Sequence, residues 1–406
     1  LRYEGTEVGR MSMEFLHEGV PMPTREAVWA GAGNSRDTKR GKQGANSSSP
    51  SVEQTLKALL AHPNIASKRC IIRQYDHEVQ GRTVVHPLTL TQRGAEGPAD
   101  AAVLQVLAEK NRGLAIGNGL ATGLADDPYL MALAAVDECV RNLVCVGADP
   151  ARIAILDNFC WPGCNDEVMM GLLVRAAHGC YDAAKAYRTP FISGKDSLNN
   201  QFTTEGGKTI RIPPTLLISG MGIVPDLMKC ATMDAKQAGN LLVMVGMTHK
   251  AMGGSHYQMI HGTLPNSAEG ELPTIDLESG PKTARAVHEL IKRGLVRAAH
   301  DCSEGGMLVA AAEMAFAGEL GLQIDLSTVR ADEHLNQAAM CFSETPSRYL
   351  LEVERKNLAA ADHVLRGLPY AVIGEFNRSD RMIVTGGVLN IRIEDLRTAW
   401  SGTLNW

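Results

Sequence analysis

The sequence has 406 residues, of which 45% are hydrophobic and 21% charged, and its formal net charge at pH 7 is -5. This length predicts two or three domains with enough apolar residues for real cores. The charge balance excludes the strongly basic footprint of a nucleic-acid-binding protein. No run approaches the roughly 20 apolar residues of a membrane helix, and the first 30 residues lack the apolar core of a signal peptide. We therefore expect a soluble, cytoplasmic protein with no nucleic-acid or membrane partner.

The nine cysteines are scattered, without C-x-x-C pairs. This pattern argues against a disulfide framework and against a structural zinc site. Reduced thiols are typical of a cytosolic protein. None of the cysteines has a context that marks it as a nucleophile, so a reaction that used glutamine nitrogen would need a glutaminase elsewhere.

The first 50 residues divide into two segments. Residues 1–30 include "MSMEFLHEGVPMP", which is too short to bury its own apolar face and is interpreted as a strand and turn that belong to something larger. Residues 31–50 are rich in Gly, Ser, Asn and basic residues and are predicted to be a flexible linker. Ser51 and Gln54 then form a capping box ahead of a predicted amphipathic helix.

Residues 51–228 are predicted to form a first α/β domain. Strands are expected at 99–107, 152–156, 190–193 and 215–224. A helix is expected to begin after Asp127, with Pro128 at its first position, and to end at Gly147. A second helix is expected over about 166–187.

The pattern restarts near residue 230, which predicts a second α/β domain over 229–406. Its expected strands include "NLLVMVG", "LVRAAH" and segments around 348–354 and 370–376. Its expected helices include "TARAVHELIKRG" and "GMLVAAAEMAFAG".

The stretch "PFISGKDSLNN" places Gly194, Lys195 and Asp196 at the expected end of a strand. It is not a Walker A loop, because Thr189 stands where that loop needs glycine and Asp196 follows the lysine in place of Ser or Thr. A cation, a carboxylate and a hydroxyl at one strand end suit phosphate chemistry, and they equally suit a charged turn.

A second candidate for anion binding is "AHDCSEGG", residues 299–306. A strand ends at Asp301, and Ser303, Gly305 and Gly306 lead into an apolar helix whose first backbone N–H groups could bind an anion. The alternative is a serine-capped helix with flexible glycines.

Several further polar residues could hold a metal-bound nucleotide. Glu138 and Asn142 lie on one face of the predicted helix, where they could grip one ligand or simply face solvent. Asp100 falls within an apolar predicted strand and needs a partner, for which a metal ion is one candidate. With Asp301, these residues offer the oxygen ligands that Mg²⁺ prefers. Lys68 is a further cation whose alternative is an ordinary surface position.

Seven ordered motifs resemble the second half of phosphoribosylformylglycinamidine synthase, an amidotransferase of purine biosynthesis in the aminoimidazole ribonucleotide synthetase-like superfamily. The resemblance covers about residues 64–406, and "MEFLHEGVPMP" resembles the end of the first half, so residues 1–30 are expected to be the tail of a preceding repeat. The motifs are "RQYDHEVQGRTVV", "GPADAAVLQV", "DPYLMALAAVDECVRNLVCVGADPARIAILDNF", "ISGKDSLNNQF", "IPPTLLISGMGIVPD", "HDCSEGGMLVAAAEMAFAG" and "FSETPSRYLLEV".

The resemblance implies an α/β (α+β) fold in which an N-terminal domain forms a barrel with the matching domain of the other half, followed by a C-terminal α/β domain. It also implies a structural ADP site with Mg²⁺ in this half. By resemblance, Asp100, Glu138, Asn142 and Asp301 match the metal ligands and Lys68 contacts the nucleotide. The "SGKDS" loop matches a segment near the nucleotide, although some family members have Asn-Val in place of Lys195 and Asp196.

In the family reaction, ATP phosphorylates the formylglycinamide oxygen of formylglycinamide ribonucleotide, and ammonia then displaces phosphate to give the amidine. The implied partners are the first half of the synthetase and a glutaminase domain or subunit, and an unpaired sheet predicts self-association. Two alternatives stay open: a single-repeat homodimer resembling aminoimidazole ribonucleotide synthetase, and a non-catalytic nucleotide-binding scaffold.

Overall fold

The structure is a computed structural model that describes residues 1–19, 22–29, 31, 51–90, 95–250, 252–262, 271–331 and 335–405. Apart from Gly31, the predicted linker lies outside the described residues. Among the described helices, none has the length and apolar character needed to cross a membrane.

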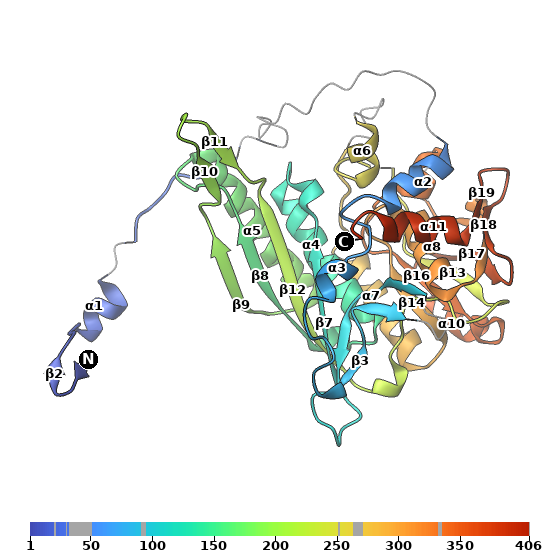
Figure 1. The fold of residues 1–406 in the computed structure, drawn as a ribbon, viewed down its shortest axis with the longest axis horizontal. Helices are drawn as coiled ribbons and strands as arrows, with labels where there is room; N and C mark the ends of the chain where they lie inside the picture. Colours follow the sequence, from blue (N-terminus) through green and yellow to red (C-terminus); the bar gives the residue numbers. More distant parts are fainter. Residues whose placement is uncertain are drawn as a thin grey trace.

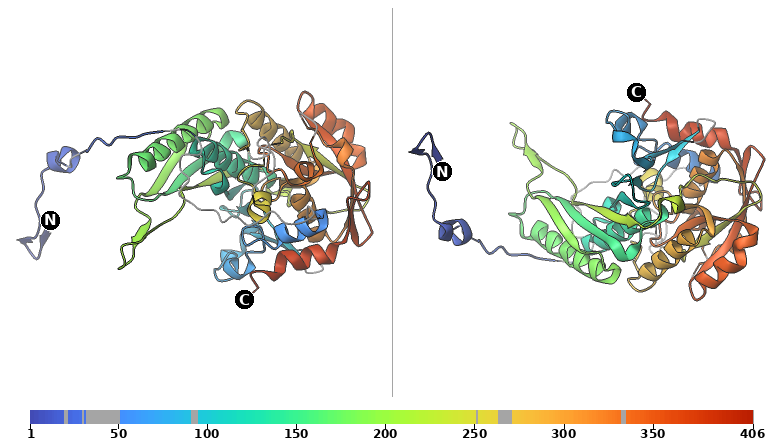
Figure 2. Two further views of the ribbon diagram at one scale, coloured as in Figure 1. Left: turned by 90° about the horizontal axis from the view of Figure 1, so that it is seen from above. Right: turned by 90° about the horizontal axis from the view of Figure 1, so that it is seen from below.

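The N-terminal segment extends away from the rest of the chain (Figures 1 and 2). It contains a two-stranded hairpin, β1 (Arg2–Tyr3) and β2 (Thr6–Glu7), and the short helix α1 (Met13–Glu18), none of whose residues is buried. Residues 22–29 return to the body, where Val28 N–H donates to the Glu167 carbonyl at 2.9 Å and the Arg175 guanidinium lies 4.6 Å from the Trp29 ring centre.

The first unit is a six-stranded sheet with the order β3-β6-β7-β12-β8-β9, antiparallel except for the β8–β9 pair. Two long helices, α4 (Pro128–Cys145) and α5 (Glu167–Tyr187), cover one face, as Figure 2 shows. The strands are β3 (Thr83–Val85), β6 (Ala102–Leu104), β7 (Gly113–Leu120), β8 (Ile153–Cys160), β9 (Phe191–Ser197) and β12 (Thr215–Val224).

Within the described residues, no helix covers the opposite face of this sheet. Side chains alternate along β7, so Ala115 is fully buried against α4, whereas Ile116 on the other face is 42% exposed. Ile192 on β9 and Met221 on β12 are also exposed. The hairpin of β10 (Gln201–Thr203) and β11 (Thr209–Arg211) adds exposed Phe202 and Ile210.

The second unit is a seven-stranded sheet with the order β14-β16-β13-β17-β15-β18-β19, in which only β15 and β18 are parallel. Its strands are β13 (Leu241–Val245), β14 (Val296–Asp301), β15 (Gly321–Ile324), β16 (Tyr349–Val353), β17 (Tyr370–Asn377), β18 (Arg381–Val384) and β19 (Leu389–Arg392). Its helices are α6 (His256–His261), α7 (Ser279–Lys292), α8 (Gly306–Gly318), α9 (Gln337–Phe342), α10 (Leu358–Leu365) and α11 (Ile393–Gly402).

Every residue of β13 and β16 is buried, because helices cover both faces of this sheet. Val243 and Leu351 on one face belong to the same apolar cluster as α4 of the first unit, together with residues of α7. Leu242 and Met244 on the other face pack with α8 and α11. The two units therefore share one continuous core.

The segment between the linker and the first sheet packs on the second unit. The predicted capping box is confirmed at α2 (Val52–Leu60), whose Leu56, Leu59 and Leu60 are fully buried in the cluster around α8. Helix α3 (Arg69–Ile72) and the two-stranded sheet of β4 (Leu88–Leu90) and β5 (Glu96–Pro98) follow. The domain boundary at residue 228 stays a prediction. Helix α2 precedes this boundary in the sequence but packs on the second unit.

The structure confirms the α/β fold and most predicted elements of both domains. It corrects two of them. Asp100 lies in the bend before β6, outside the strand, because the extended segment predicted over 99–107 is reduced to Ala102–Leu104. "SGKDS" belongs to β9 itself and is not a loop after the strand.

Candidate functional site

A cleft of about 630 Å³ is lined by residues of both units. The first unit contributes the turn after β7, with Leu120 to Leu124, and the inner face of α4. The second contributes the loop before α6 and the segments that precede α8 and follow α9. The polar residues of the lining are Asn64, Lys68, Thr122, Glu138, Arg141, Ser255, His256, Ser303, Glu304 and Glu344.

A group of buried acidic residues lies beside this cleft, where β14 ends. Asp301 is 6% exposed, and its backbone N–H donates to Asp100 Oδ1 at 2.9 Å. The same oxygen lies 2.8 Å from His300 Nδ1, whereas the other oxygen, Asp100 Oδ2, is buried without a partner among the described residues. An unpaired buried carboxylate oxygen is costly, and a cation would satisfy it.

Two side chains of α4 hold the end of β7. Glu138 Oε2 accepts the Leu120 N–H at 2.8 Å, and Asn142 Nδ2 donates to the Asn118 carbonyl at 2.9 Å. The Asn142 amide oxygen is consequently the atom left to ligate a cation. Glu138 lines the cleft and Asn142 lies one helical turn further along the same face, as their spacing predicted.

The carboxyl groups of this region repel one another when ionised. Burial, followed by the charges of Glu304 and Asp301, raises the pKa of Glu138 well above its usual value. Burial, with Glu344 and Asp301 nearby, raises the pKa of Glu304 to about 7. A divalent cation would relieve this repulsion, and carboxylate and amide oxygens are the ligands that Mg²⁺ prefers. Asp100, Glu138, Asn142 and Asp301 thus fit a Mg²⁺ site in their chemistry.

Arg141 is a cleft residue that the sequence analysis missed. Its guanidinium is 3% exposed, forms an ion pair with Asp137, and contacts Asp301 Oδ2 at 3.3 Å and Ser303 Oγ at 2.7 Å. The available signal was its position in a mostly apolar helix four residues after Asp137, since arginine is rarely buried without a partner. It fixes Asp301 and Ser303 in place.

Lys68 lines the cleft next to a second polar cluster. Its Nζ donates to the carbonyls of Ala66 at 2.6 Å and Asn64 at 3.1 Å. Burial lowers the pKa of Lys68, and the charge of Glu304 partly offsets that effect. A lysine held at the rim of an acidic cleft is suited to contact a phosphate group.

His256 and Glu344 also escaped the sequence analysis. Glu344 Oε1 accepts the His256 backbone N–H at 2.8 Å and lies 3.1 Å from His256 Nδ1. Burial opposes protonation of this imidazole, but the hydrogen bond and charge of Glu344 outweigh it, so the pKa of His256 is raised. Glu344 follows Ser343 in "FSETPSRYLLEV", which was used only as part of the resemblance.

The backbone N–H groups at the start of α8 were expected to bind an anion, but two of them are already hydrogen-bonded within the chain. Gly305 N–H donates to Glu344 Oε1 at 2.7 Å, and Gly306 N–H donates to the Ser303 carbonyl at 3.0 Å. The expectation that these two amides are free for an anion is therefore corrected, because the chain supplies its own carboxylate there. Ser303 does line the cleft.

Gly194, Lys195 and Asp196 lie apart from the other candidates. They belong to β9, the exposed edge strand of the first sheet, and none of them lines the cleft. Lys195 Nζ contacts the neighbouring Ser197 Oγ. The structure thus brings together Lys68, Asp100, Glu138, Asn142, Asp301 and Ser303 around one cleft, and leaves the "SGKDS" residues outside it.

A two-domain α/β fold with an acidic cleft between its units defines a class of proteins, and two family models identify it. The model described as AIR synthase related protein, N-terminal domain, matches residues 98–224, and its C-terminal counterpart matches residues 237–387. The chain belongs to the family of AIR synthase related proteins.

Within this family, the chain is similar to the subunit PurL of phosphoribosylformylglycinamidine synthase, which confirms the resemblance. The Deinococcus radiodurans subunit is 36% identical, over all of this chain and 52% of that protein. The Thermococcus sibiricus subunit is 37% identical, over 80% of this chain and 42% of that protein. The chain therefore spans about half the length of the curated relatives that it matches.

Solved structures show the same fold. T. maritima PurL complexed with FGAR has a TM-score of 0.65 and 18% identity, over 86% of this chain and 54% of that chain. AaThiL complexed with AMPPCP and TMP has a TM-score of 0.52 and 14% identity, over 72% of this chain and 89% of that chain.

Proposed function

We propose that the chain is the second synthetase half of a cytoplasmic phosphoribosylformylglycinamidine synthase and that its cleft holds an adenine nucleotide with Mg²⁺. The whole enzyme converts formylglycinamide ribonucleotide, ATP and glutamine-derived ammonia to the amidine, as a carbon–nitrogen ligase. The observation that carries the nucleotide site is the unpaired buried oxygen of Asp100 beside Asp301 and Glu138.

Solved structures of a relative support the binding of an adenine nucleotide. T. maritima PurL has been solved with ADP, with ATP and with AMPPCP. In our proposal, Asp100, Glu138, Asn142 and Asp301 hold Mg²⁺, which offsets the charge of the phosphates. Lys68 contacts a phosphate group, and Ser303, which is hydrogen-bonded to Asp301, contacts the nucleotide beside the metal ion.

The proposed partners are the first half of the synthetase and a glutaminase. A structure named PurLQS from T. maritima supports an assembly of several subunits. The uncovered face of the first sheet, with Ile116, Met221 and Ile192 exposed, is suited to pair with the matching domain of the other half. In its absence, the same face would pair two copies of this chain.

A second candidate is a single-repeat enzyme that functions as a homodimer. The match to AaThiL favours this candidate. It covers 89% of the AaThiL chain, so the fold also occurs as a single copy in one protein. Turnover separates the two candidates. A second half alone should bind nucleotide without making product, whereas a single-repeat enzyme should be active.

The test is to measure melting of nucleotide-free protein with and without Mg-ADP, followed by ammonia-dependent turnover with ATP and formylglycinamide ribonucleotide. A ligand at one hundred times its dissociation constant stabilises the folded state by about 2.7 kcal/mol. We expect this shift and little or no product. Absence of any shift would remove the nucleotide site, and robust turnover would favour the single-repeat enzyme.

A further inference from the structure

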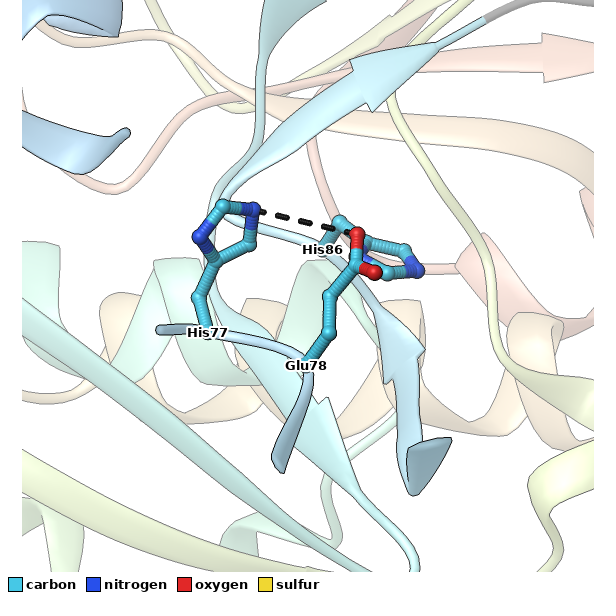
Figure 3. A group of neighbouring side chains, drawn as sticks. All are labelled: His77, Glu78 and His86. Atoms are coloured by element: carbon cyan, nitrogen blue, oxygen red, sulfur yellow. Dashed lines mark ion pairs between the residues drawn. The ribbon is translucent and has the colours of Figure 1, made fainter. Parts of the chain in front are cut away.

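Three side chains with metal-binding chemistry meet on the surface of the first unit, apart from the nucleotide cleft. His77 and Glu78 lie just before the short turn of helix η1 (Val79–Gly81), and His86 follows strand β3. Figure 3 shows the Glu78 carboxylate between the two imidazole rings. None of the three lines the nucleotide cleft.

The backbone brings these residues together through a tight reversal. Gln80 and Gly81 have φ values of 58° and 62°, in the left-handed region, which turn the chain back so that His86 lies beside His77 and Glu78. Thr83 Oγ1 donates to the His77 carbonyl at 2.6 Å, and Glu78 N–H donates to Asp76 Oδ1 at 2.8 Å. Hydrogen bonds of the backbone thus hold His77 and Glu78 in place.

The ligand atoms are spaced nearly as a metal ion requires. Glu78 Oε1 lies 3.5 Å from His86 Nδ1 and 4.0 Å from His77 Nε2, and the three ligand atoms all lie within 4.8 Å of one another. In a tetrahedral site with bonds of about 2.0–2.2 Å, neighbouring ligand atoms are about 3.4 Å apart. Small side-chain rotations would close the remaining gap.

The hydrogen bonding of His77 supplies an independent indication. Its Nδ1 lies 3.1 Å from the Tyr75 carbonyl, which can only accept a hydrogen bond, so Nδ1 carries the proton. The lone pair of the neutral ring is then on Nε2, the atom that faces Glu78. Histidines that bind metals are oriented in this way, with the second nitrogen donating to a carbonyl or carboxylate.

We propose that His77, Glu78 and His86 form a binding site for a divalent transition-metal ion of the zinc type. The ligands are His77 Nε2, a Glu78 carboxylate oxygen and His86 Nδ1. Two imidazoles and one carboxylate favour zinc, cobalt or nickel over magnesium, which distinguishes this site from the oxygen ligands of the cleft. The side chains are 31%, 64% and 42% exposed, so the fourth position is open to water and the ion can exchange with solvent.

The alternative is a simple surface ion pair between Glu78 and protonated histidines. Exposed pairs of this kind contribute little to stability and are screened by salt. The two readings differ in one measurable property: only the metal site binds a stoichiometric ion that both histidines are needed to hold.

The test is a titration of the full chain with Co²⁺, with Zn²⁺ as competitor and excess Mg²⁺ present to occupy the oxygen ligands of the cleft. We expect one equivalent with visible d–d absorption and no thiolate charge-transfer band, which excludes binding by cysteine. His77→Ala and His86→Ala should each weaken binding at least about tenfold. His178→Ala removes an exposed histidine on α5 and should leave binding unchanged.

Glu78→Gln keeps the size of the side chain and tests the carboxylate without disturbing the fold. It should weaken binding in the same direction while far-ultraviolet circular dichroism stays unchanged. Equal affinity in wild type and all three site variants, absence of a bound equivalent in wild type, or a thiolate band that accounts for all of the absorption would each overturn the proposal.

Discussion

Asp301 is the residue on which the nucleotide cleft depends most directly. Its side chain contacts Arg141 and Ser303, and its backbone N–H donates to Asp100. Asp301→Asn keeps the size of the side chain but removes the charge that a cation needs. We expect Mg-ADP affinity to fall at least about tenfold, as measured by calorimetric titration.

The matched control is Asp380→Asn, which changes an exposed aspartate far along the chain from the cleft. Asp380→Asn should bind Mg-ADP as wild type does. Unchanged affinity in Asp301→Asn, in protein that melts normally, would show that Asp301 is not a ligand.

The buried acids of the cleft also predict how binding depends on pH. The pKa of Glu304 is raised to about 7 and that of Glu138 is raised well above its usual value, so both carboxyls hold protons in the free protein at acidic pH. Mg²⁺ must displace the proton from its ligand Glu138, and its charge favours the ionised form of nearby Glu304. The affinity for Mg-ADP should therefore rise with pH through about 7, more steeply than the affinity for ADP alone.

The same two carboxyls also predict how the stability of the ligand-free protein changes with pH. A carboxyl whose pKa is raised by folding favours the folded state while it is protonated, and that contribution is lost as the pH rises from the unfolded value to the folded value. Glu304→Gln should flatten the fall of the melting temperature between the ordinary pKa of 4.5 and about 7. An unchanged slope in the variant would contradict the raised pKa.

At the residue scale, the sequence could identify residues able to bind a metal ion or a nucleotide, but it could not show which of them lie close together. Asp100 was predicted because an acid among apolar residues needs a partner, and Asp301 because it ends a strand beside a glycine-rich helix start. Glu344 was not, because its role depends on contact with Gly305 and His256, which are distant in sequence. Lys195 has the positive charge that suits a phosphate group, but it lies on β9, outside the cleft.

At the scale of elements, the close packing of α4 on β7 depends on Gly119. A Cβ atom at this position would lie 2.1 Å from the Ala135 carbonyl oxygen in α4. Gly119→Ala would force the helix away from the sheet and should destabilise the protein by about 1–3 kcal/mol. Gly402→Ala, where nothing lies within 4 Å, is the control and should change the unfolding free energy little.

That packing explains which elements the sequence could predict. Helix α4 began where expected because Asp127 and Pro128 are local signals that need no tertiary context. Strand β7 was missed because its "GLAIGNGL" sequence contains three glycines, which lower strand propensity. Two of them, Gly117 and Gly119, are explained by the close approach of α4. The position of α2 on the second unit likewise follows from packing that no local pattern encodes.

At the scale of the whole molecule, the uncovered sheet face predicts self-association of the isolated chain. Ile116 is 42% exposed and its strand partner on β12 is Met221, so one change places a charge in the middle of the apolar face. Ile116→Lys should lower the average mass in sedimentation equilibrium toward that of a monomer.

Met228→Lys is the matched control, because Met228 is 82% exposed and lies outside the sheet. It should leave the mass unchanged. A wild-type chain that is monomeric at every concentration would contradict the self-association prediction.

The apolar core shared by α4, β13 and β16 affects how far the two units can move relative to each other at the cleft between them. Hinged enzymes close around ligands because their domains meet across thin, polar contacts that can part. Here the two walls are joined by continuous apolar packing, which resists such opening. The cleft should therefore be preformed and should bind its ligand without a hinge motion of the two units. Heating should unfold both units in a single calorimetric peak.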